Sequence, residues 1–273
     1  MHIQTLKYHW VWLIILLALS SACQKDDFNK PRVDVYAHSG MSLYEERSIY
    51  PSNSFEAIEY SIDVLSAEGI EIDIQFTKDS VPVLFHDAFI TKSPNFNGCV
   101  GGYTWDILKE LKYDYSNYSI VTLKKVLDFA INRGVKVYLD IKEFNHCSGI
   151  SFPDDAVSSQ LDSILINYTE KEKDLIVVGS FNIELLKKIN LLNKCIETKH
   201  INEGILIAQE HDFNYILFPF QVLNQENGEK LKFTPFRWGV YGGKANGEIK
   251  KTIGFEPSFM ISDNFVFTQK ITE

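Results

Sequence analysis

The fold is decided by a short stretch in which isoleucine alternates with acid, Gly69-Ile70-Glu71-Ile72-Asp73-Ile74. Successive side chains of a β-strand point to opposite faces, so this alternation predicts a strand with isoleucine on one face and acid on the other. The carboxylates of Glu71 and Asp73 then lie roughly 7 Å apart at the usual rise per residue. Because like charges on one inward face repel each other, we expect a cation beside them or a protonated acid.

A second strand repeats this arrangement in Val137-Tyr138-Leu139-Asp140-Ile141-Lys142. Asp140 and Lys142 alone are equally well explained as an ion pair at a strand end. If the two strands are neighbours in one closed sheet, however, three acids and one lysine converge. The acids then exceed the lysine by two charges, which one divalent cation would neutralise, and uncompensated buried charges are strongly unfavourable. We therefore predict a divalent cation site on Glu71, Asp73 and Asp140.

Two histidines, His38 and His86, each end an apolar run. The run Val81–Phe85 begins too soon after the first acidic strand for a parallel crossover, so Thr77-Lys78-Asp79-Ser80 is predicted to be a hairpin turn. That hairpin would carry His86 back towards the acids. The following stretch, 87–119, is expected to be an insertion that caps one end of the fold. Taken singly, each histidine is also compatible with a structural role.

Strand and helix patterns alternate along the rest of the chain, which predicts a parallel sheet. Eight such units over about 240 residues favour a (β/α)8 TIM barrel, with a doubly wound sheet as the alternative. The predicted strands are Val33–Ala37, Ile70–Gln75, Val135–Ile141, Leu175–Gly179, Cys195–Lys199, Tyr215–Phe218, Phe236–Tyr241 and Phe259–Ser262. The clearest predicted helices are Ser54–Ala67, Trp105–Leu111, Leu123–Asn132, Asp155–Tyr168 and Ile183–Leu192.

The first 22 residues have the layout of a secretory signal, because Lys7 precedes the apolar run Val11–Leu19 and small residues precede Cys23. A cysteine at this place is typical of a lipid-modified bacterial envelope protein, and simple secretion is the alternative. We expect residues 1–22 to be removed, Cys23 to be lipidated, and 23–32 to be a tether. The barrel domain is expected over 33–273, held at the outer membrane on its periplasmic or surface face.

Charge and cysteine content limit the partners and the compartment. Removing residues 1–22 deletes one lysine and changes the formal charge from -9 to -10, which disfavours nucleic acid as a partner. No feature of the sequence indicates a protein partner. In an oxidising envelope, Cys99 and Cys147 are candidates for one disulfide with Cys195 free. Three unpaired buried cysteines are an equal alternative.

The ordered motifs of the chain resemble those of glycerophosphodiester phosphodiesterases. The resemblance runs from His38 to Asp263 and rests on His38-Ser39-Gly40, Pro51-Ser52-Asn53-Ser54, Glu71-Ile72-Asp73, Thr77-Lys78-Asp79, His86-Asp87, Asp140-Ile141-Lys142, Ser180-Phe181, Trp238 and Ser262-Asp263. Members of this superfamily are TIM barrels that cleave a phosphodiester with a divalent metal and two histidines. They also carry an insertion after the second histidine.

The resemblance assigns roles residue by residue. It implies that Glu71, Asp73 and Asp140 bind the metal, that His38 and His86 act as acid and base, and that Lys142 contacts phosphate. Phe181 and Trp238 fall where relatives line the substrate pocket. Ser39 stands where relatives have arginine, so a substrate phosphate meets one neutral hydroxyl in place of a charged fork. Relatives also carry glutamate at Ser52, glutamate at Asp140 and commonly asparagine at Tyr241.

These roles predict metal-dependent hydrolysis of a glycerophosphodiester or a related phospholipid headgroup diester. Oxygen ligands favour Mg²⁺ or Ca²⁺ over zinc, and histidine suits proton transfer because its pKa lies near neutrality. The changes at Ser39 and Ser52 leave a second hypothesis open. In that hypothesis the barrel is weakly active or inactive and binds a phosphorylated ligand or glycan at the cell envelope.

Overall fold

The computed structural model describes residues 32–41, 49–91, 93–113, 116–142, 147, 149–150 and 152–273. In these residues eight parallel strands form a closed barrel, and the predicted TIM barrel is confirmed. Closure comes from β1, which pairs with β11 along its length and with β2 where Ala37 lies opposite Ile70. This contact excludes the open, doubly wound sheet. The barrel strands are β1 (Asp34–Ala37), β2 (Gly69–Phe76), β6 (Lys136–Ile141), β7 (Ile176–Ser180), β8 (Lys194–Glu197), β9 (Tyr215–Pro219), β10 (Arg237–Tyr241) and β11 (Phe259–Ser262).

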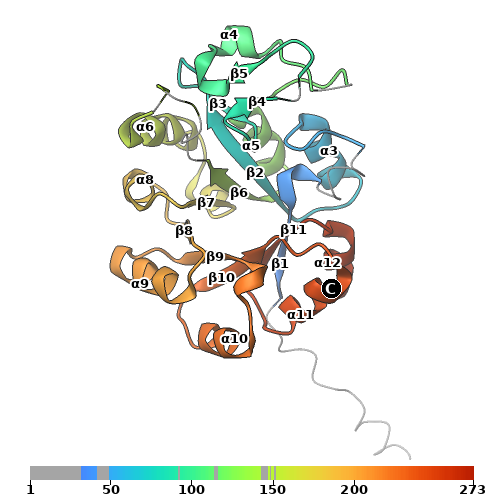
Figure 1. Cartoon of the computed structure of the whole chain (residues 1–273), viewed down its shortest axis with the longest axis vertical. Coiled ribbons are helices and arrows are strands. Elements are labelled where there is room, and N and C mark those ends of the chain that lie inside the picture. Colours follow the sequence, from blue (N-terminus) through green and yellow to red (C-terminus); the bar gives the residue numbers. More distant parts are fainter. Residues whose placement is uncertain are drawn as a thin grey trace, which may run out of the picture. The chain divides into compact units, whose positions relative to one another are not determined.

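Helices surround the barrel strands (Figure 1). They are α3 (Phe55–Asp63), α5 (Leu123–Ile131), α6 (Asp154–Leu165), α7 (Glu170–Lys173), α8 (Ile183–Lys188), α9 (Ile201–His211), α10 (Gln225–Lys232), α11 (Asn246–Ile253) and α12 (Phe265–Thr272). Several predicted helices end earlier than expected. After α3, Ser66 adopts a left-handed φ of 56°, and Ile189 after α8 is extended, so neither helix continues. Two short 3₁₀ turns, η2 (His38–Gly40) and η4 (Phe220–Val222), follow β1 and β9.

The alternation in β2 separates two packed layers. Ile70, Ile72 and Ile74 are fully buried in the layer between the barrel and its helices. The interior of the barrel is a different cluster, which contains aromatic side chains such as Tyr138 and Phe259. Since Glu71 and Asp73 have the opposite parity from the isoleucines, they face the interior, as the sequence predicts.

The hairpin that leads to the insertion ends in β3 (Pro82–Leu84), which runs antiparallel to the end of β2. The predicted hairpin turn is present, and Ser80 within it adopts a φ of 63°. Beyond β3 lie β4 (Phe89–Ile90), β5 (Gly98–Cys99), η3 (Val100–Gly102) and α4 (Trp105–Leu108), which lie together beyond the hairpin in Figure 1. They enclose a small core of their own, to which Phe85, Val100 and Leu108 belong.

A disulfide joins this insertion to the segment that follows β6. Cys99 and Cys147 are bonded with their Cα atoms 6.0 Å apart, and Cys195 is a free, buried thiol. Of the two alternatives open from the sequence, the structure contains the paired one. The disulfide therefore fixes the insertion to the same end of the barrel at which β6 delivers Asp140.

The predicted signal segment 1–22, Cys23 and the tether up to residue 31 lie outside the described residues. Within the described part of the chain, no helix combines the length and the apolar character needed to cross a bilayer.

Candidate active site

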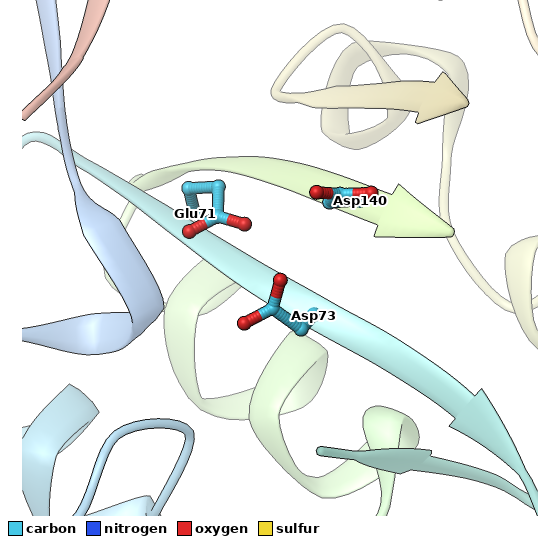
Figure 2. Close-up of side chains that lie close together, drawn as sticks. All are labelled: Glu71, Asp73 and Asp140. Atoms are coloured by element: carbon cyan, nitrogen blue, oxygen red, sulfur yellow. The ribbon is translucent and has the colours of Figure 1, made fainter. Parts of the chain in front are cut away.

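The three predicted acids meet at one place in the barrel. Glu71 and Asp73 project from β2, and Asp140 projects from the neighbouring strand β6, where it lies directly opposite Asp73 (Figure 2). One carboxylate oxygen from each residue lies within 4.8 Å of the other two. Glu71 and Asp73 are almost completely buried. The structure thus brings together the acids that the strand pattern assigned to one face.

Lys142 adds a positive charge to this cluster. It follows the last residue of β6, and its backbone N–H donates to the carbonyl of Ile74 at 3.2 Å. Its Nζ lies 2.8 Å from Oδ1 of Asp73 and forms a second ion pair with Asp140. Within the cluster three carboxyl groups therefore share one ammonium group, which is the charge imbalance expected from the sequence.

Ser39 and Asn53 hold the carboxylates from the loops that follow β1 and precede α3. The backbone N–H of Ser39 donates to Glu71 at 2.7 Å, and its hydroxyl donates to Asp73 at 3.0 Å. Asn53 donates from Nδ2 to Asp73 at 2.6 Å and accepts the backbone N–H of Asp73 at 3.0 Å. Both residues adopt left-handed backbone angles, with φ of 49° and 63°. In this structure Ser39 therefore orients the acids.

His38 stands at the end of β1, beside Glu71. Its Nδ1 is hydrogen bonded to Asp263, and its Nε2 lies 3.9 Å from Oε2 of Glu71. Burial lowers the pKa of His38, but the charge of Glu71 and the bond to Asp263 raise it more, to about 9. Asp263 was noted in the sequence only as part of a motif, and its role as the partner of His38 was missed. It is 225 positions away in the sequence, so only barrel closure brings it here.

His86 lies just beyond β3, where the predicted hairpin carries it back along β2. Its side chain is 60% exposed, and Nδ1 pairs with Asp87 at 2.7 Å, which leaves Nε2 available. The electrostatic effect of His86 opposes protonation of both Asp73 and Asp140. The side-chain amide of Gln75, another residue that sequence reasoning missed, donates to the backbone carbonyl of His86 at 3.2 Å.

Burial and the neighbouring charges shift the pKa values of the three acids in different directions. Burial and the charge of Asp73 raise the pKa of Glu71 to about 8. Burial also acts on Asp73, but Lys142 and His86 outweigh it and hold the pKa of Asp73 well below its usual range. Burial raises the pKa of Asp140 despite the nearby Lys142. Burial and mutual repulsion thus favour the protonated form of Glu71 and of Asp140, and protonation is one of the two ways of relieving this charge that the strand pattern implies.

Two observations indicate that the cluster suits a hard divalent cation. First, its donors are carboxylate oxygens, the ligands that Mg²⁺ and Ca²⁺ prefer. Second, Oδ1 of Asp73 is buried, and among the described residues its partner is the ion-paired Nζ of Lys142 at 2.8 Å, with no bond that meets hydrogen-bond geometry. A buried carboxylate oxygen without a well-aligned hydrogen bond can accept a further cation as a ligand.

The two aromatic residues expected in the substrate pocket lie in different surroundings. Phe181 follows β7 and is 43% exposed. Trp238 is 3% exposed and belongs to the core layer between barrel and helices. Its position on β10 explains this difference, because Gly239 and Tyr241 have the parity that faces the interior, and Tyr241 packs against the interior cluster. Here Trp238 is a packing residue, and Tyr241 is the aromatic side chain of β10 that packs against the barrel interior.

A further acid, Glu197 at the end of β8, was not singled out from the sequence. It is buried in the barrel and accepts a hydrogen bond from the hydroxyl of Tyr138 at 2.9 Å. Burial and the charge of Asp140 raise the pKa of Glu197 well above its ordinary value. An alternation of acid and apolar residues could have indicated it only weakly, because Cys195-Ile196-Glu197 contains a single charge.

Comparison with known proteins identifies relatives over most of the chain. The model of the glycerophosphoryl diester phosphodiesterase family matches residues 46–221, more than half of the chain. A glycerophosphodiester phosphodiesterase of Caldanaerobacter subterraneus is 28% identical over 225 residues, which cover 76% of this chain and 85% of that protein.

Solved structures share the fold. A phosphodiesterase of Oleispira antarctica, solved in complex with the product sn-glycerol-3-phosphate, has a TM-score of 0.72 at 17% identity and covers 88% of this chain and 96% of that one. A glycerophosphodiester phosphodiesterase of Parabacteroides distasonis has a TM-score of 0.70 at 17% identity, covering 88% and 98%.

Proposed function

Because the chain belongs to the glycerophosphoryl diester phosphodiesterase family of hydrolases, we propose that it cleaves a glycerophosphodiester or a related phospholipid headgroup diester. The observation that carries this proposal is the convergence of Glu71, Asp73 and Asp140 beside Lys142 and His38. Such a cluster offers a cation site and a fixed positive charge, which are the two features that an anionic phosphodiester requires.

Glu71, Asp73 and Asp140 are the residues that would hold the cation, Mg²⁺ or Ca²⁺. When bound there, it would supply a positive charge that attracts a phosphoryl oxygen and offsets the negative charge that grows on the oxygens of the phosphoryl group during the reaction. Ser39 and Asn53 keep the carboxylates of Glu71 and Asp73 in place before substrate arrives. Lys142 would contact the phosphate as a second, permanent positive charge.

Two histidines would move the protons. One neutral histidine takes the proton of the nucleophile as the new oxygen–phosphorus bond forms. The other, protonated, gives its proton to the departing alkoxide as the bond between phosphorus and that oxygen breaks. The nucleophile is water or an adjacent hydroxyl of the substrate. Asp263 on Nδ1 of His38 and Asp87 on Nδ1 of His86 would leave the Nε2 atom of each ring for these transfers.

The test is hydrolysis by the purified mature chain with Mg²⁺ or Ca²⁺, followed by phosphorus NMR on a panel of glycerophosphodiesters and phospholipid headgroup diesters. From the wild type we expect a phosphomonoester, or a cyclic phosphate if a hydroxyl of the substrate attacks. From the Asp73→Asn variant we expect no product. If no diester is cleaved but a phosphorylated ligand or a glycan raises the melting temperature, the chain is a binding protein instead.

We also propose that Cys23 carries a lipid anchor and that the barrel acts at the bacterial cell envelope. The support is the apolar run and small residues that precede Cys23, together with a disulfide, which persists in oxidising compartments. Radioactive palmitate should label the wild type and not Cys23→Ser, and the wild type should fractionate with membranes. Labelling of both, or of neither, would contradict the anchor.

A further inference from the structure

The side chain of His86 is poorly held by packing. It is 60% exposed, and the partner of its ring, Asp87, is its equally exposed neighbour in the chain. A catalytic ring must nevertheless keep its place within a fraction of an ångström. Since its surroundings do not confine the ring, the backbone from which it projects has to be fixed.

Gln75 provides such a fixed point. It is 1% exposed and lies two residues after Asp73 on the interior-facing side of β2. Its Nε2 donates to the backbone carbonyl of His86 at 3.2 Å. The strand pairing does not reach that carbonyl, because β3 ends at Leu84 and the last backbone bond of the hairpin runs from Phe85 to Asp73. The Gln75 amide therefore continues the connection between β2 and the returning chain by one residue.

Packing alone does not explain a glutamine at this position. Its Oε1 is buried and receives no hydrogen bond from the described residues. A buried acceptor without a donor costs free energy that an apolar side chain of the same size would avoid. The gain that offsets this cost is the bond from the other end of the same amide to His86.

The insertion holds the next part of this backbone. The carbonyl of Ala88 accepts the backbone N–H of Val100 at 2.9 Å, and Sγ of Cys147 lies 3.4 Å from the same oxygen. The segment 86–88 is thus tied at its first residue to β2 and at its last residue to the disulfide-linked insertion. Between these two points the side chains of His86 and Asp87 are the exposed ones.

We propose that Gln75 is a positioning residue that fixes His86 through its backbone carbonyl and so sets where the second histidine stands relative to Asp73 and Asp140. This inference rests on the proposed function, since it assigns His86 a part in catalysis. The inference adds Gln75 to the residues of the proposed active site. Its side chain contacts the backbone of His86 and takes no part in proton transfer.

The test is a double-mutant cycle on the full chain with Gln75→Met and His86→Ala, because methionine matches glutamine in size without the amide. We expect Gln75→Met to lower kcat at least about tenfold while KM changes less than about twofold, since misplacement acts on the chemical step. In the His86→Ala background the same change should have no further effect on kcat. A matched control is Gln269→Met, which removes a similar 3.2 Å bond from a glutamine to the carbonyl of Ser66 and should leave kcat unchanged.

A second readout needs no activity. In long-range proton–nitrogen NMR spectra without substrate, the ring signals of His86 should broaden or shift in Gln75→Met and stay unchanged in Gln269→Met. If the wild type cleaves no diester, the proposed function fails, and these spectra alone then decide whether Gln75 positions His86. Failure of the proposed function can therefore be distinguished from failure of the positioning inference. Independent, additive losses of kcat in the cycle, or unchanged His86 signals, would overturn the inference.

Discussion

At the scale of single residues, the acids are held by side chains from outside their own strands. Asn53 both donates to the carboxylate of Asp73 and accepts its backbone N–H, and it is itself buried. Because Asn53 also has a left-handed φ of 63°, replacement by alanine would add backbone strain to the loss of hydrogen bonds. Glycine removes the side chain without that strain.

We predict that Asn53→Gly lowers the free energy of unfolding by about 1–3 kcal/mol, because the buried backbone N–H of Asp73 loses its Asn53 acceptor and the carboxylate loses one of its donors. It should also weaken binding of Mg²⁺ or Ca²⁺ by about 10–100-fold, the usual cost of losing a residue that orients a metal ligand. Urea unfolding and calorimetric titration measure the two effects. Asp212→Gly is the control, since Asp212, the C-cap of α9, has a left-handed φ of 56° and makes none of the hydrogen bonds described for the acids, so neither property should change. Equal behaviour of the two variants would contradict the role of Asn53.

The pH dependence of stability follows from Glu71 and His38. The pKa of Glu71 is about 8 in the folded chain against an ordinary 4.5, so ionisation is penalised and stability falls as the pH rises through this range. The pKa of His38 is about 9 against 6.5, so its contribution is present at low pH and is lost as the pH rises. Both effects have the same sign.

In the presence of a chelator we therefore predict that the melting temperature falls between pH 6 and about pH 8, and that excess Mg²⁺ or Ca²⁺ reduces this fall. A bound cation favours the ionised form of Glu71 and removes its penalty. Differential scanning calorimetry at several pH values measures both series. A melting temperature that rises with pH in the chelator series, or identical series, would show that these groups do not titrate as inferred.

The residues that the sequence could identify are those that repeat along a strand. The alternation in β2 and β6 was sufficient to bring Glu71, Asp73 and Asp140 together, because the strand period fixes which side chains share a face. Asp263 and Gln75 were missed because their roles depend on which backbone or ring lies opposite them. No pattern within a strand reveals that partner.

At the scale of elements, one disulfide links the insertion to the segment that follows β6. The Cys99–Cys147 disulfide spans 48 positions of the sequence and joins β5 to the segment after β6. In the chain-entropy view a loop of this length contributes about 4 kcal/mol to stability, the upper end of the usual range of about 2–4 kcal/mol. The part of the chain that it restrains includes the small core around Phe85 and Val100.

We predict that Cys99→Ser with Cys147→Ser lowers stability by about 2–4 kcal/mol and that amide exchange quickens in 82–113 before it quickens in β7 to β9. The reason is that the insertion has a small core of its own, so it can open while the barrel stays folded. Hydrogen exchange with mass spectrometry resolves these regions. Cys195→Ala, which changes the free thiol, should leave the exchange of the insertion unaltered. Uniform loss of protection would mean that insertion and barrel unfold together.

The order of the strands and helices could be predicted from the sequence, but the face on which some side chains lie and the ends of some helices could not. All eight barrel strands and the hairpin occur where the apolar runs predict them. The placement of Trp238 failed because the family motif indicates a position in sequence, whereas the parity of β10 puts that side chain in the outer layer. Helix ends were overestimated where a left-handed or extended residue, such as Ser66 or Ile189, stops the helix without proline or glycine.

At the scale of the whole molecule, the barrel interior is closely packed at the level of Asp140, which lies opposite Gly179 on the neighbouring strand β7. A Cβ atom at Gly179 on β7 would lie 1.9 Å from the hydroxyl of Tyr138 and 2.7 Å from Oε1 of Glu197. Glycine is therefore needed there for close packing, and the Tyr138–Glu197 bond fills the space that a side chain would occupy. The interior of the barrel is thus closely packed directly beside Asp140.

We predict that Gly179→Ala destabilises the chain by about 1–3 kcal/mol, the usual cost of overpacking a core. Gly247→Ala is the matched control, because nothing lies within 4 Å of a Cβ there and the residue is in helix α11. That control should be neutral or slightly stabilising. Denaturant unfolding compares the two, and a stable Gly179→Ala chain would show that the interior is less closely packed than the structure indicates.

The central claim is that three carboxylates from two neighbouring strands hold one divalent cation. Crystals of the mature chain soaked in Mn²⁺, a replacement with strong anomalous scattering, test it most directly. The account predicts one anomalous peak at about 2.0–2.6 Å from oxygens of Glu71, Asp73 and Asp140, which is the range for hard cations with oxygen ligands. Full occupancy of a site elsewhere, or no peak among these carboxylates at saturating Mn²⁺, would contradict it.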